Sequence, residues 1–561
     1  MTKYIFVCGG VMSGIGKGTT TASIGRVLKD YGFSVTTLKI DPYFNVDAGT
    51  LNPIVHGEVF VTDDGTEADQ DLGNYERFLE QDMGALNIMT SGLVYRTVIE
   101  RERNLEYGGK DVQMMSDVPE EVLRRITALA DAAKTDFVLI EVGGTAGDNE
   151  NLVFLEAARV LKLNHPNDVM FVLVSYLPVL GSVGEMKTKP TQHAVRALGS
   201  VGITTDMIIA RSTVPIDQPR KEKISRICSI SPEDVIAAPD VFSIYEIPVN
   251  FERDLIGRRI LEKFGLTVRA HDSTAWQDMV ARIHDAKHEI AIGIVGKYFV
   301  SGDFSLTDAY LSVIEAIKHA SWRLGFQPKI VWIDSEIYEK EPKKIAELDG
   351  YGGIIVPGGF GRRGVEGKIA AIRYARERNI PYFGLCYGMQ LATIEFARNV
   401  CGLTNAHTTE VNPETPYPVI TVMEEQQAII NEKRYGGSMR LGAYDCQLTP
   451  GSISMRAYLQ DPSDAEKNAV ISERHRHRYE FNNTYRKELT EKGLVIAGHN
   501  PQRDLVEIIE IKDHPFFVGT QFHPELKSRP LHPHPLFLSF IRAAMQFQKN
   551  APLEDGAVKK G

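Results

Sequence analysis

The sequence is poor in cysteine and has no long hydrophobic run. Its five cysteines include no Cys-x-x-Cys pair, so we expect neither a disulfide framework nor a zinc site, and we expect a reducing, cytoplasmic location. No apolar stretch reaches the roughly 20 residues that a membrane helix needs, which argues against a membrane protein. The chain enters a strand-like run at Tyr4 without a basic leader, so we expect no signal peptide.

Positive charge is also in short supply. The chain has 73 acidic and 63 basic residues, which gives a formal net charge of −10. This balance disfavours a general nucleic-acid-binding surface, and we expect no nucleic-acid partner. At 561 residues the chain is too long for one ordinary hydrophobic core, so we expect two or more domains.

What the sequence does contain is an alternation of short apolar runs and helical patterns. Ile24, Val27, Leu28 and Tyr31 have helical spacing, and Gly32 is placed to end that helix. Continuous apolar runs, which are typical of buried parallel strands, occur at 4–8, 35–40, 137–140, 170–174, 207–210, 290–295, 329–333, 353–356 and 381–385. The pattern predicts an α/β fold with two doubly wound domains.

A polar stretch without strand runs, from about Gly265 to Lys287, separates the two halves. We therefore predict one domain at 1–266, a linker at 267–288 and a second domain at 289–548. The small, polar segment 549–561 is predicted to be a disordered tail.

A glycine-rich loop, CGGVMSGIGKGTT, spans Cys8 to Thr20. The common phosphate-loop pattern has glycine where this chain has Val11, and serine or threonine where it has Gly18. A strand–loop–helix unit still aims backbone N–H groups at one point, beside the positive end of the helix dipole. We expect Lys17 to add charge for phosphates and Thr19 or Ser13 to supply the hydroxyl. The alternative is a purely structural glycine turn.

Two carboxylates are candidates for holding Mg²⁺ beside this loop, because hard cations prefer oxygen ligands. Glu141 follows the apolar run Phe137–Ile140, where the acid of a nucleotide site is expected. Asp71, in EADQDLGNYERF, is the second candidate. The alternative for Asp71 is an ordinary solvated loop acid.

The second half contains a nucleophile elbow. Gly384-Leu385-Cys386-Tyr387-Gly388 has the spacing of a sharp strand-to-helix turn that raises a nucleophile out of a sheet. In TQFHPEL, His523 could serve as the base and Glu525 as the group that orients it, on one face if the segment is a strand. Backbone N–H groups of the Gly358–Gly361 loop and of Tyr387 could hold an oxyanion. Singly, such residues are more often inert; together they favour a catalytic site.

These motifs identify a resemblance that covers nearly the whole chain. The N-terminal half resembles the P-loop-type amidoligase (synthetase) domain of the CTP synthase family, and the C-terminal half resembles class I glutamine amidotransferases. The matching segments are GGVMSGIGKG, KIDPYFNVDAGTLNPIVHGEVFVTDDG, DQDLGNYERF, EVGGTAGD, KTKPTQHAV, PGGFGRRGVEGK, GLCYGMQ, RHRHRYEFNN and QFHPE. The family's own phosphate loop also lacks the first glycine and has glycine after the lysine.

The resemblance implies a ligase that converts UTP to CTP. ATP phosphorylates O4 of the uracil ring, and ammonia from glutamine passes through an internal tunnel and displaces the phosphate. The triad is Cys386, His523 and Glu525, with Mg²⁺ at Asp71 and Glu141. GTP is an allosteric activator that acts near Arg362–Glu366, CTP is a feedback inhibitor at the UTP site, and the assembly is a homotetramer that could form filaments.

The resemblance also implies three sets of ligand contacts. For ATP they are Gly14, Ile15, Gly16, Lys17, Gly18, Thr19, Asp71 and Val241. For UTP and CTP they are Ser13, Asp148, Asn149, Glu150, Lys187, Thr188, Lys189, Pro190, Thr191, Gln192 and Lys223; position 149 is often apolar in the family, so Asn149 departs from the pattern. For glutamine they are Gly359, Tyr387, Gly388, Met389, Gln390, Glu410 and Arg478.

Two other functions remain as alternatives. Another ATP-dependent amidoligase with a glutaminase half, such as a cobyrinic-acid amidase, would share the phosphate loop and the elbow but lack KTKPTQ and HGEVFVTDDG, which are present. A nucleotide-sensing regulator built on an inactive enzyme would have lost Lys17 or a member of the triad, and all are present.

Overall fold

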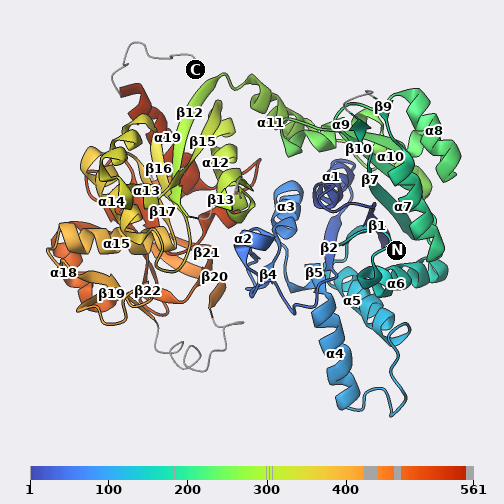
Figure 1. Cartoon of the computed structure of the whole chain (residues 1–561), viewed down its shortest axis with the longest axis horizontal. Helices are drawn as coiled ribbons and strands as arrows, with labels where there is room; N and C mark the ends of the chain where they lie inside the picture. Colours follow the sequence, from blue (N-terminus) through green and yellow to red (C-terminus); the bar gives the residue numbers. More distant parts are fainter. Residues whose placement is uncertain are drawn as a thin grey trace. The chain divides into compact units, whose positions relative to one another are not determined.

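The computed structural model describes residues 2–180, 185–297, 300–301, 304–305, 307–422, 439–459 and 469–550. By its internal contacts the chain forms two units (Figure 1). Unit 1 comprises Met1–Thr50 and Glu67–Val280, and unit 2 comprises Leu51–Thr66 and Ala281–Gly561. The division at 280 falls inside the predicted linker, and the excursion of residues 51–66 into unit 2 was not predicted. The domain limits proposed from sequence stay predictions.

Unit 1 is built on a seven-stranded parallel sheet. Its strands, in spatial order, are β11 (Val235–Pro239), β10 (Met207–Ser212), β7 (Val169–Tyr176), β1 (Lys3–Gly9), β6 (Phe137–Val142), β2 (Val35–Asp41) and β5 (Ile88–Thr90). The apolar runs predicted as strands in this half are confirmed. The runs are continuous because helices cover both faces of the sheet.

Alternate residues of the strands serve the two faces of this sheet. Phe6 and Cys8 join one core cluster with residues of α5 (Asp117–Ala133) and α6 (Leu152–Asn164), while Ile5 and Val7 are buried on the opposite face. The helix α1 (Lys17–Asp30), predicted from its spacing, contacts β1, β2 and β6. Further helices of unit 1 are α3 (Gln70–Leu79), α4 (Ser91–Arg103), α7 (Lys189–Ser200), α8 (Gln218–Cys228), α9 (Ile247–Arg253) and α10 (Ile256–Lys263). The division between the units falls within α11 (Thr274–Asp285).

The strand order reverses at β1, which determines where a ligand can bind. Its two neighbours, β6 and β7, follow one another in the chain but lie on opposite sides of it. The connections therefore diverge beyond the carboxyl end of β1 and leave a crevice there. The glycine-rich loop occupies this position.

Unit 2 contains a nine-stranded mixed sheet. Five parallel strands are β15 (Phe326–Asp334), β12 (His288–Gly296), β16 (Gly353–Val356), β17 (Tyr382–Leu385) and β25 (Phe517–Thr520). The sheet continues antiparallel through β24 (Leu505–Ile511), β23 (Leu494–Asn500), β20 (Arg440–Leu448) and β21 (Val470–His477). The predicted parallel strands are confirmed, whereas the antiparallel half was not predicted.

Helices cover both faces of the parallel half. Ile354 and Tyr382 pack in a cluster with residues of α14 (Val365–Arg378) and α15 (Tyr387–Asn399). Ile355 and Phe383, one residue further on, pack with α12 (Leu311–Arg323) and α19 (Pro535–Asn550). Smaller elements are α2 (Pro53–His56), β3 (Phe60–Val61), α13 (Glu336–Lys340), β18 (Ala406–Thr408), β19 (Tyr417–Val422), α17 (Ile453–Tyr458), β22 (Tyr479–Phe481) and α18 (Arg486–Glu491).

Three further predictions can be compared with this fold. Lys549 and Asn550, assigned from sequence to the tail, belong to α19, and residues 551–561 lie outside the described residues. All five cysteines are free thiols. Within the described ranges, no helix has both the length and the apolar character needed to cross a bilayer.

Candidate active sites

The glycine-rich loop joins β1 to α1 and ends at Gly16, which adopts a φ of 82° as the residue preceding the helix. Ser13 and Gly14 are exposed, whereas Ile15 is buried. The Thr19 hydroxyl donates to the carbonyl of Gly16 at 3.1 Å. The loop thus presents an exposed edge directly before the N-terminus of a long helix, which is the expected geometry of an anion site.

The glycine after the lysine has a steric cause. A side chain on Gly18 would collide with the carboxylate of Asp71, which lies against the first turn of α1. Asp71 is held there in the first turn of α3, where its backbone N–H donates to the side chain of Asp69 at 3.0 Å. A carboxylate in this chain therefore takes the space of the usual serine or threonine side chain.

Two buried lysines serve different partners in this site. Lys17 Nζ donates to the carbonyl of Gly144 at 2.8 Å, and burial lowers the pKa of Lys17. Lys39 Nζ donates to Glu141 Oε1 at 2.9 Å and also pairs with Asp71. It lies 3.6 Å from Asp41 Oδ1 and 3.4 Å from Asp69 Oδ2.

Negative charge exceeds positive charge around Lys39. Burial alone would lower the pKa of Lys39, but the carboxylates outweigh it and hold that pKa well above its usual value. Burial raises the pKa of Asp41 to about 6, against the opposing effect of Lys39. Burial, reinforced by Asp41, raises the pKa of Asp69 to about 8. Even with Asp69 protonated, the other acids outnumber the ammonium groups of Lys39 and Lys17, so the site favours further cations.

The donor set fits Mg²⁺ better than any softer metal, because every available ligand is a carboxylate oxygen. Asp71 and Glu141, the two predicted ligands, are brought together here through Lys39. Glu141 is 1% exposed and accepts a hydrogen bond from the Tyr75 hydroxyl. Among the described residues, no three acidic, histidine or cysteine side chains are arranged as a metal-ligand set as they stand; Lys39 Nζ lies among these carboxylates.

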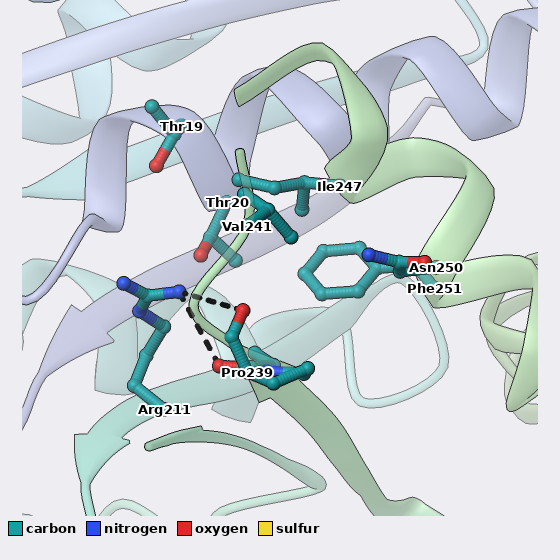
Figure 2. Close-up of a pocket in the computed structure, with 9 residues that line it drawn as sticks. Thr19, Thr20, Arg211, Pro239, Val241, Ile247, Asn250 and Phe251 are labelled. Atoms are coloured by element: carbon teal, nitrogen blue, oxygen red, sulfur yellow. Dashed lines mark hydrogen bonds between the residues drawn. The ribbon is translucent and has the colours of Figure 1, made fainter. Parts of the chain in front are cut away.

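A pocket beside the loop contains the residue expected to contact adenine, Val241. Figure 2 shows its lining, with the Arg211 guanidinium on one side and the Phe251 ring on the other. Arg211 Nη1 donates to the carbonyls of Ala238 and Pro239 at 3.3 and 3.4 Å. The other lining residues are Thr19, Thr20, Ile247 and Asn250. The pocket has apolar walls, and the polar groups of Thr19 and Arg211 stand at its edge, an arrangement that suits a flat heterocycle attached to phosphates.

Most residues expected to contact the pyrimidine nucleotide lie on loops after β6 and β7. The Thr145 N–H donates to Asp148 Oδ2 at 2.6 Å, while Asn149 and Glu150 are exposed. Thr191 is buried, its hydroxyl 2.9 Å from that of Ser175 at the end of β7. Lys187, Thr188, Lys189, Pro190 and Gln192 form the entry to α7, where Gln192 Nε2 donates to Thr188 Oγ1 at 3.0 Å. Lys223 lies exposed on α8.

In unit 2, Cys386 lies at the predicted elbow between β17 and α15. Its backbone has a φ of 48° and a ψ of −96°, a conformation that costs energy for a residue with a side chain. Gly388 is required because a side chain there would collide with the carbonyl of Val356 on the neighbouring strand. Gln521 Nε2 approaches the Cys386 sulfur at 3.6 Å. The strain places the thiol before the N-terminus of a helix, as the motif predicts.

His523 and Glu525 lie beside this thiol. His523 Nδ1 is 2.8 Å from Glu525 Oε1, and a side chain on Gly358 would come within 3.0 Å of His523 Cε1 and 3.9 Å of Cys386 Cβ. Burial alone would lower the pKa of His523, but Glu525 and Cys386 raise it well above its usual value. The two residues do not share a strand face, because the segment is not a strand: β25 ends at Thr520, and Glu525 lies in the short 3-10 helix Pro524–Lys527.

The glycine loop after β16 faces the elbow. The Tyr387 hydroxyl donates to the carbonyl of Gly361 at 3.1 Å, and the Gly361 N–H donates to Glu410 Oε1 at 2.8 Å. Burial raises the pKa of Glu410, while Lys297 and Arg478 oppose that rise. The predicted oxyanion loop, Glu410 and Arg478 are therefore brought into one neighbourhood.

The other predicted glutamine contacts are more deeply placed. Gln390 is 2% exposed, and its amide donates to the Tyr479 carbonyl at 2.8 Å and to Gln521 Oε1 at 3.3 Å. Met389 is fully buried in the core beneath the elbow. In the predicted activator segment Arg362–Glu366, Arg363 pairs with Glu336, and Glu366 pairs with Arg398 at 2.8 Å.

Sequence reasoning missed Lys39, Arg211, Gln521 and Lys368. The first two had a signal, because each charge interrupts an apolar strand run, TLKID or IIARS. Lys368 lies on α14 with its Nζ 5.4 Å from the Tyr387 ring centroid, and burial lowers its pKa to about 7. Within the described residues this Nζ has no hydrogen-bond partner.

Two family models together match most of the chain. A family model described as CTP synthase N-terminus matches residues 3–266, and one described as Glutamine amidotransferase class-I matches residues 305–543. The solved glutaminase domain of Trypanosoma brucei CTPS with bound acivicin is 39% identical, with a TM-score of 0.41; the match covers 46% of this chain and 94% of that one.

Curated relatives match along nearly the whole chain. The CTP synthase of Carboxydothermus hydrogenoformans is 50% identical over 98% of this chain and 100% of its own length. That of Caldanaerobacter subterraneus subsp. tengcongensis is 48% identical over 98% of this chain and 99% of its own. The CTP synthase of Methanothermobacter thermautotrophicus is 48% identical over 97% of this chain and 99% of its own length. On this identity, across both units, the chain belongs to the CTP synthase family.

Proposed function

We propose that the chain makes CTP from UTP, ATP and glutamine as a glutamine-hydrolysing ligase. The observation that carries this is the similarity to CTP synthases over 97–98% of the chain, which includes both catalytic units. ATP phosphorylates O4 of UTP, and ammonia attacks C4 and expels phosphate. The net reaction consumes one glutamine and one water and yields CTP, ADP, phosphate and glutamate.

In unit 1, the loop N–H groups and Lys17 hold the ATP phosphates, with Gly14–Thr19 and Asp71 as contacts. The pocket of Val241, Arg211 and Phe251 receives the adenine. Asp71 and Glu141 would hold Mg²⁺, which when bound neutralises phosphate charge and orients the transferred group. Lys39 pairs with both carboxylates and so holds them near one another.

The pyrimidine nucleotide binds at the loops after β6 and β7. The contacts that we propose are Ser13, Asp148, Asn149, Glu150, Lys187, Thr188, Lys189, Pro190, Thr191, Gln192 and Lys223. Lys187, Lys189 and Lys223 suit a triphosphate because each is a mobile point charge. CTP would inhibit by occupying the same triphosphate contacts.

In unit 2, the Cys386 thiolate attacks the side-chain amide carbon of glutamine. The N–H groups of Gly359 and Tyr387 hold the oxyanion. The protonated His523 gives its proton to the leaving ammonia, so a thioester forms on Cys386. Water then attacks the thioester, with His523 as base, and glutamate leaves. Glu525 orients the imidazole through the 2.8 Å contact. Glu410 and Arg478 recognise the amino-acid end, as charges of opposite sign.

Regulation and assembly are inferred from the family resemblance. GTP activates glutamine hydrolysis near Arg362–Glu366, and ammonia reaches unit 1 through an internal tunnel. The enzyme works in the cytoplasm as a homotetramer that could stack into filaments. The rival amidoligase function has less support, because the relatives from Carboxydothermus hydrogenoformans and Caldanaerobacter subterraneus, which match nearly the whole chain, are CTP synthases.

The test is CTP formation from UTP, ATP and Mg²⁺ with glutamine or ammonium as nitrogen donor, followed by the absorbance of the pyrimidine ring. Cys386→Ala should lose glutamine-dependent synthesis by at least about 10³-fold and keep ammonium-dependent synthesis within about twofold. If the wild type makes CTP from neither donor, the assignment of unit 1 fails. If Cys386→Ala still uses glutamine, the assignment of the nucleophile fails.

A further inference from the structure

Residues 51–66, called here the excursion, belong to unit 2 although the chain on both sides of them belongs to unit 1. Phe60 and Val61, in β3, are 1% and 0% exposed. Glu58 fixes one part of the excursion, because its carboxylate accepts from the Ser312 N–H at the start of α12 at 3.1 and 3.2 Å. The excursion is therefore built into unit 2 and is not a loose loop.

Asp63 is the charged contact of the excursion. Its carboxylate pairs with Arg474 Nε and lies 3.3 Å from Lys527 Nζ. Burial would raise the pKa of Asp63, but Arg474 and Lys527 lower it below its usual value. The backbone carbonyl of Asp63 accepts from the Ala443 N–H at 2.9 Å. Asp63 is thus fixed through both its backbone and its side chain.

Arg474 connects Asp63 to the catalytic turn. Its side chain is 0% exposed, with the guanidinium 5.4 Å from the Phe60 ring centroid. Its backbone carbonyl accepts from the His523 N–H at 2.8 Å, and Nη1 reaches the Leu526 carbonyl at 3.4 Å. The turn that carries His523 and Glu525 is therefore held at three residues. Arg474 contacts it at residues 523 and 526, and Asp63 contacts it at Lys527.

The excursion is also tied to the nucleotide site by the chain itself. It begins ten residues after Asp41 and ends three residues before Asp69, and both are acids of the Lys39 cluster. A ligand that reorders those acids constrains both ends of the excursion. Asp63 is then a point through which that constraint can reach His523, and the two sites would share one coupling free energy.

We propose that Asp63 and Arg474 are positioning residues for the glutaminase reaction, and that their ion pair transmits the nucleotide-bound state of unit 1 to the His523–Glu525 turn. This inference rests on the proposed function. A displacement of the imidazole by about 1 Å from the Cys386 sulfur can cost about 10²-fold in rate. The pair acts on the turn and not on the glutamine contacts, so kcat should fall without a rise in KM for glutamine.

The test compares Asp63→Asn with wild type in two assays, each with saturating ATP, UTP and Mg²⁺. With glutamine as donor, kcat should fall about 10- to 100-fold at an unchanged KM. With ammonium as donor, the rate should stay within about twofold. Omitting UTP should lower glutamine hydrolysis in the wild type and have little further effect in the variant. Asp504→Asn, which breaks an exposed pair with Arg486 in unit 2, is the matched control and should behave as wild type.

Two further variants show whether the loss of kcat in Asp63→Asn comes from the ion pair or from a folding defect. The double variant Asp63→Asn/Arg474→Gln should lose much less kcat than the product of the two single losses, because the Asp63–Arg474 interaction is removed in each. Arg474→Gln alone should lose at least as much kcat as Asp63→Asn, since it also removes the contact with the Leu526 carbonyl. Additive losses, equal losses with both donors, or a rise in KM alone would overturn the proposal. A wild type that makes no CTP from ammonium overturns the proposed function and this inference together. An active wild type with an unaffected Asp63→Asn overturns the inference alone.

Discussion

The two candidate catalytic sites differ in how complete they are in the protein alone. In unit 2, the proposed nucleophile, base and orienting acid already stand together, with His523 2.8 Å from Glu525 beside the Cys386 thiol. In unit 1, Lys39 stands among Asp41, Asp69, Asp71 and Glu141. The first set is held in place by hydrogen bonds between its members, and the second gathers several acids around one lysine.

This difference follows from what each site must bind. A thioester mechanism needs only side chains, water and a neutral amide, so its groups can be fixed in advance by strain and hydrogen bonds. Phosphoryl transfer brings several negative charges that must be matched by cations. When the nucleotide binds, metal ions can replace the lysine as the positive partner of the acids in such a cluster. The nucleotide site should therefore depend strongly on solution conditions, and the glutaminase site should not.

The largest effect should come from removing one acid of the unbalanced cluster. Glu141→Gln should lower CTP formation from both donors by about 10²-fold and raise the Mg²⁺ concentration needed for half-maximal rate. The measurement is the rate against Mg²⁺ concentration with glutamine and with ammonium. Glu156→Gln, which removes an acid paired with Arg159 on α6, is the control. A loss confined to the glutamine reaction would contradict the prediction.

A substitution that restores the common phosphate-loop pattern should damage the site. Gly18→Ser would force its side chain against the Asp71 carboxylate. We expect an overpacking cost of about 1–3 kcal/mol and about a tenfold rise in KM for ATP. Both can be measured, by denaturant unfolding and by rates at varied ATP. Gly199→Ser on α7, where no described atom beyond its own stretch of helix lies within 4 Å of an added Cβ, should be near neutral. Normal ATP dependence in Gly18→Ser would show that Asp71 moves freely.

A change in stability alone is expected in unit 2, where the buried Lys368 Nζ has no hydrogen-bond partner among the described residues. Its pKa is lowered to about 7 in the folded protein, from the ordinary 10.5. Between these values the unfolded state binds more protons, so this group makes stability rise with pH. Lys368→Met should therefore stabilise the protein, on the order of 1–4 kcal/mol at pH 7.

That gain should shrink as pH rises from 7 towards 10, because the wild-type penalty disappears over this window. Urea unfolding at pH 7 and at pH 9.5 measures it. Lys344→Met, at an exposed lysine paired with Glu341, should change stability little and equally at both pH values. An equal gain from Lys368→Met at both pH values would mean that packing, and not charge, causes it.

The sequence was sufficient where a short segment determines its own geometry. The strand–loop–helix around Lys17 and the elbow at Cys386 were both predicted, because glycines, apolar runs and helix starts lie within about a dozen residues. Lys39 and Arg211 were missed because a charge inside an apolar run shows that a partner exists but does not identify it. The partners of Lys39, at positions 69, 71 and 141, come from other elements.

The segment ERHRHRYE shows the same limit in unit 2. A run with this many charges is ordinarily typical of a solvated surface, yet Glu473, Arg474 and His475 are buried in β21. Period-two patterns fail for such a strand, because ion pairs and hydrogen bonds replace apolar packing inside the sheet. The excursion could not be predicted either, since nothing within residues 51–66 shows that they pack with a part of the chain far beyond them.

The excursion has a consequence for how the chain is made. Asp63 and its partner Arg474 are separated by 411 residues. At a synthesis rate of about 5–20 residues per second, Asp63 waits roughly 20–80 s on the ribosome before Arg474 exists. During that time unit 1 can fold around a projecting segment that carries the apolar side chains of Phe60 and Val61. Unit 2 is therefore completed by a segment that is synthesised long before the rest of it. A chaperone that binds exposed apolar side chains of nascent chains would be expected to bind this segment early in synthesis.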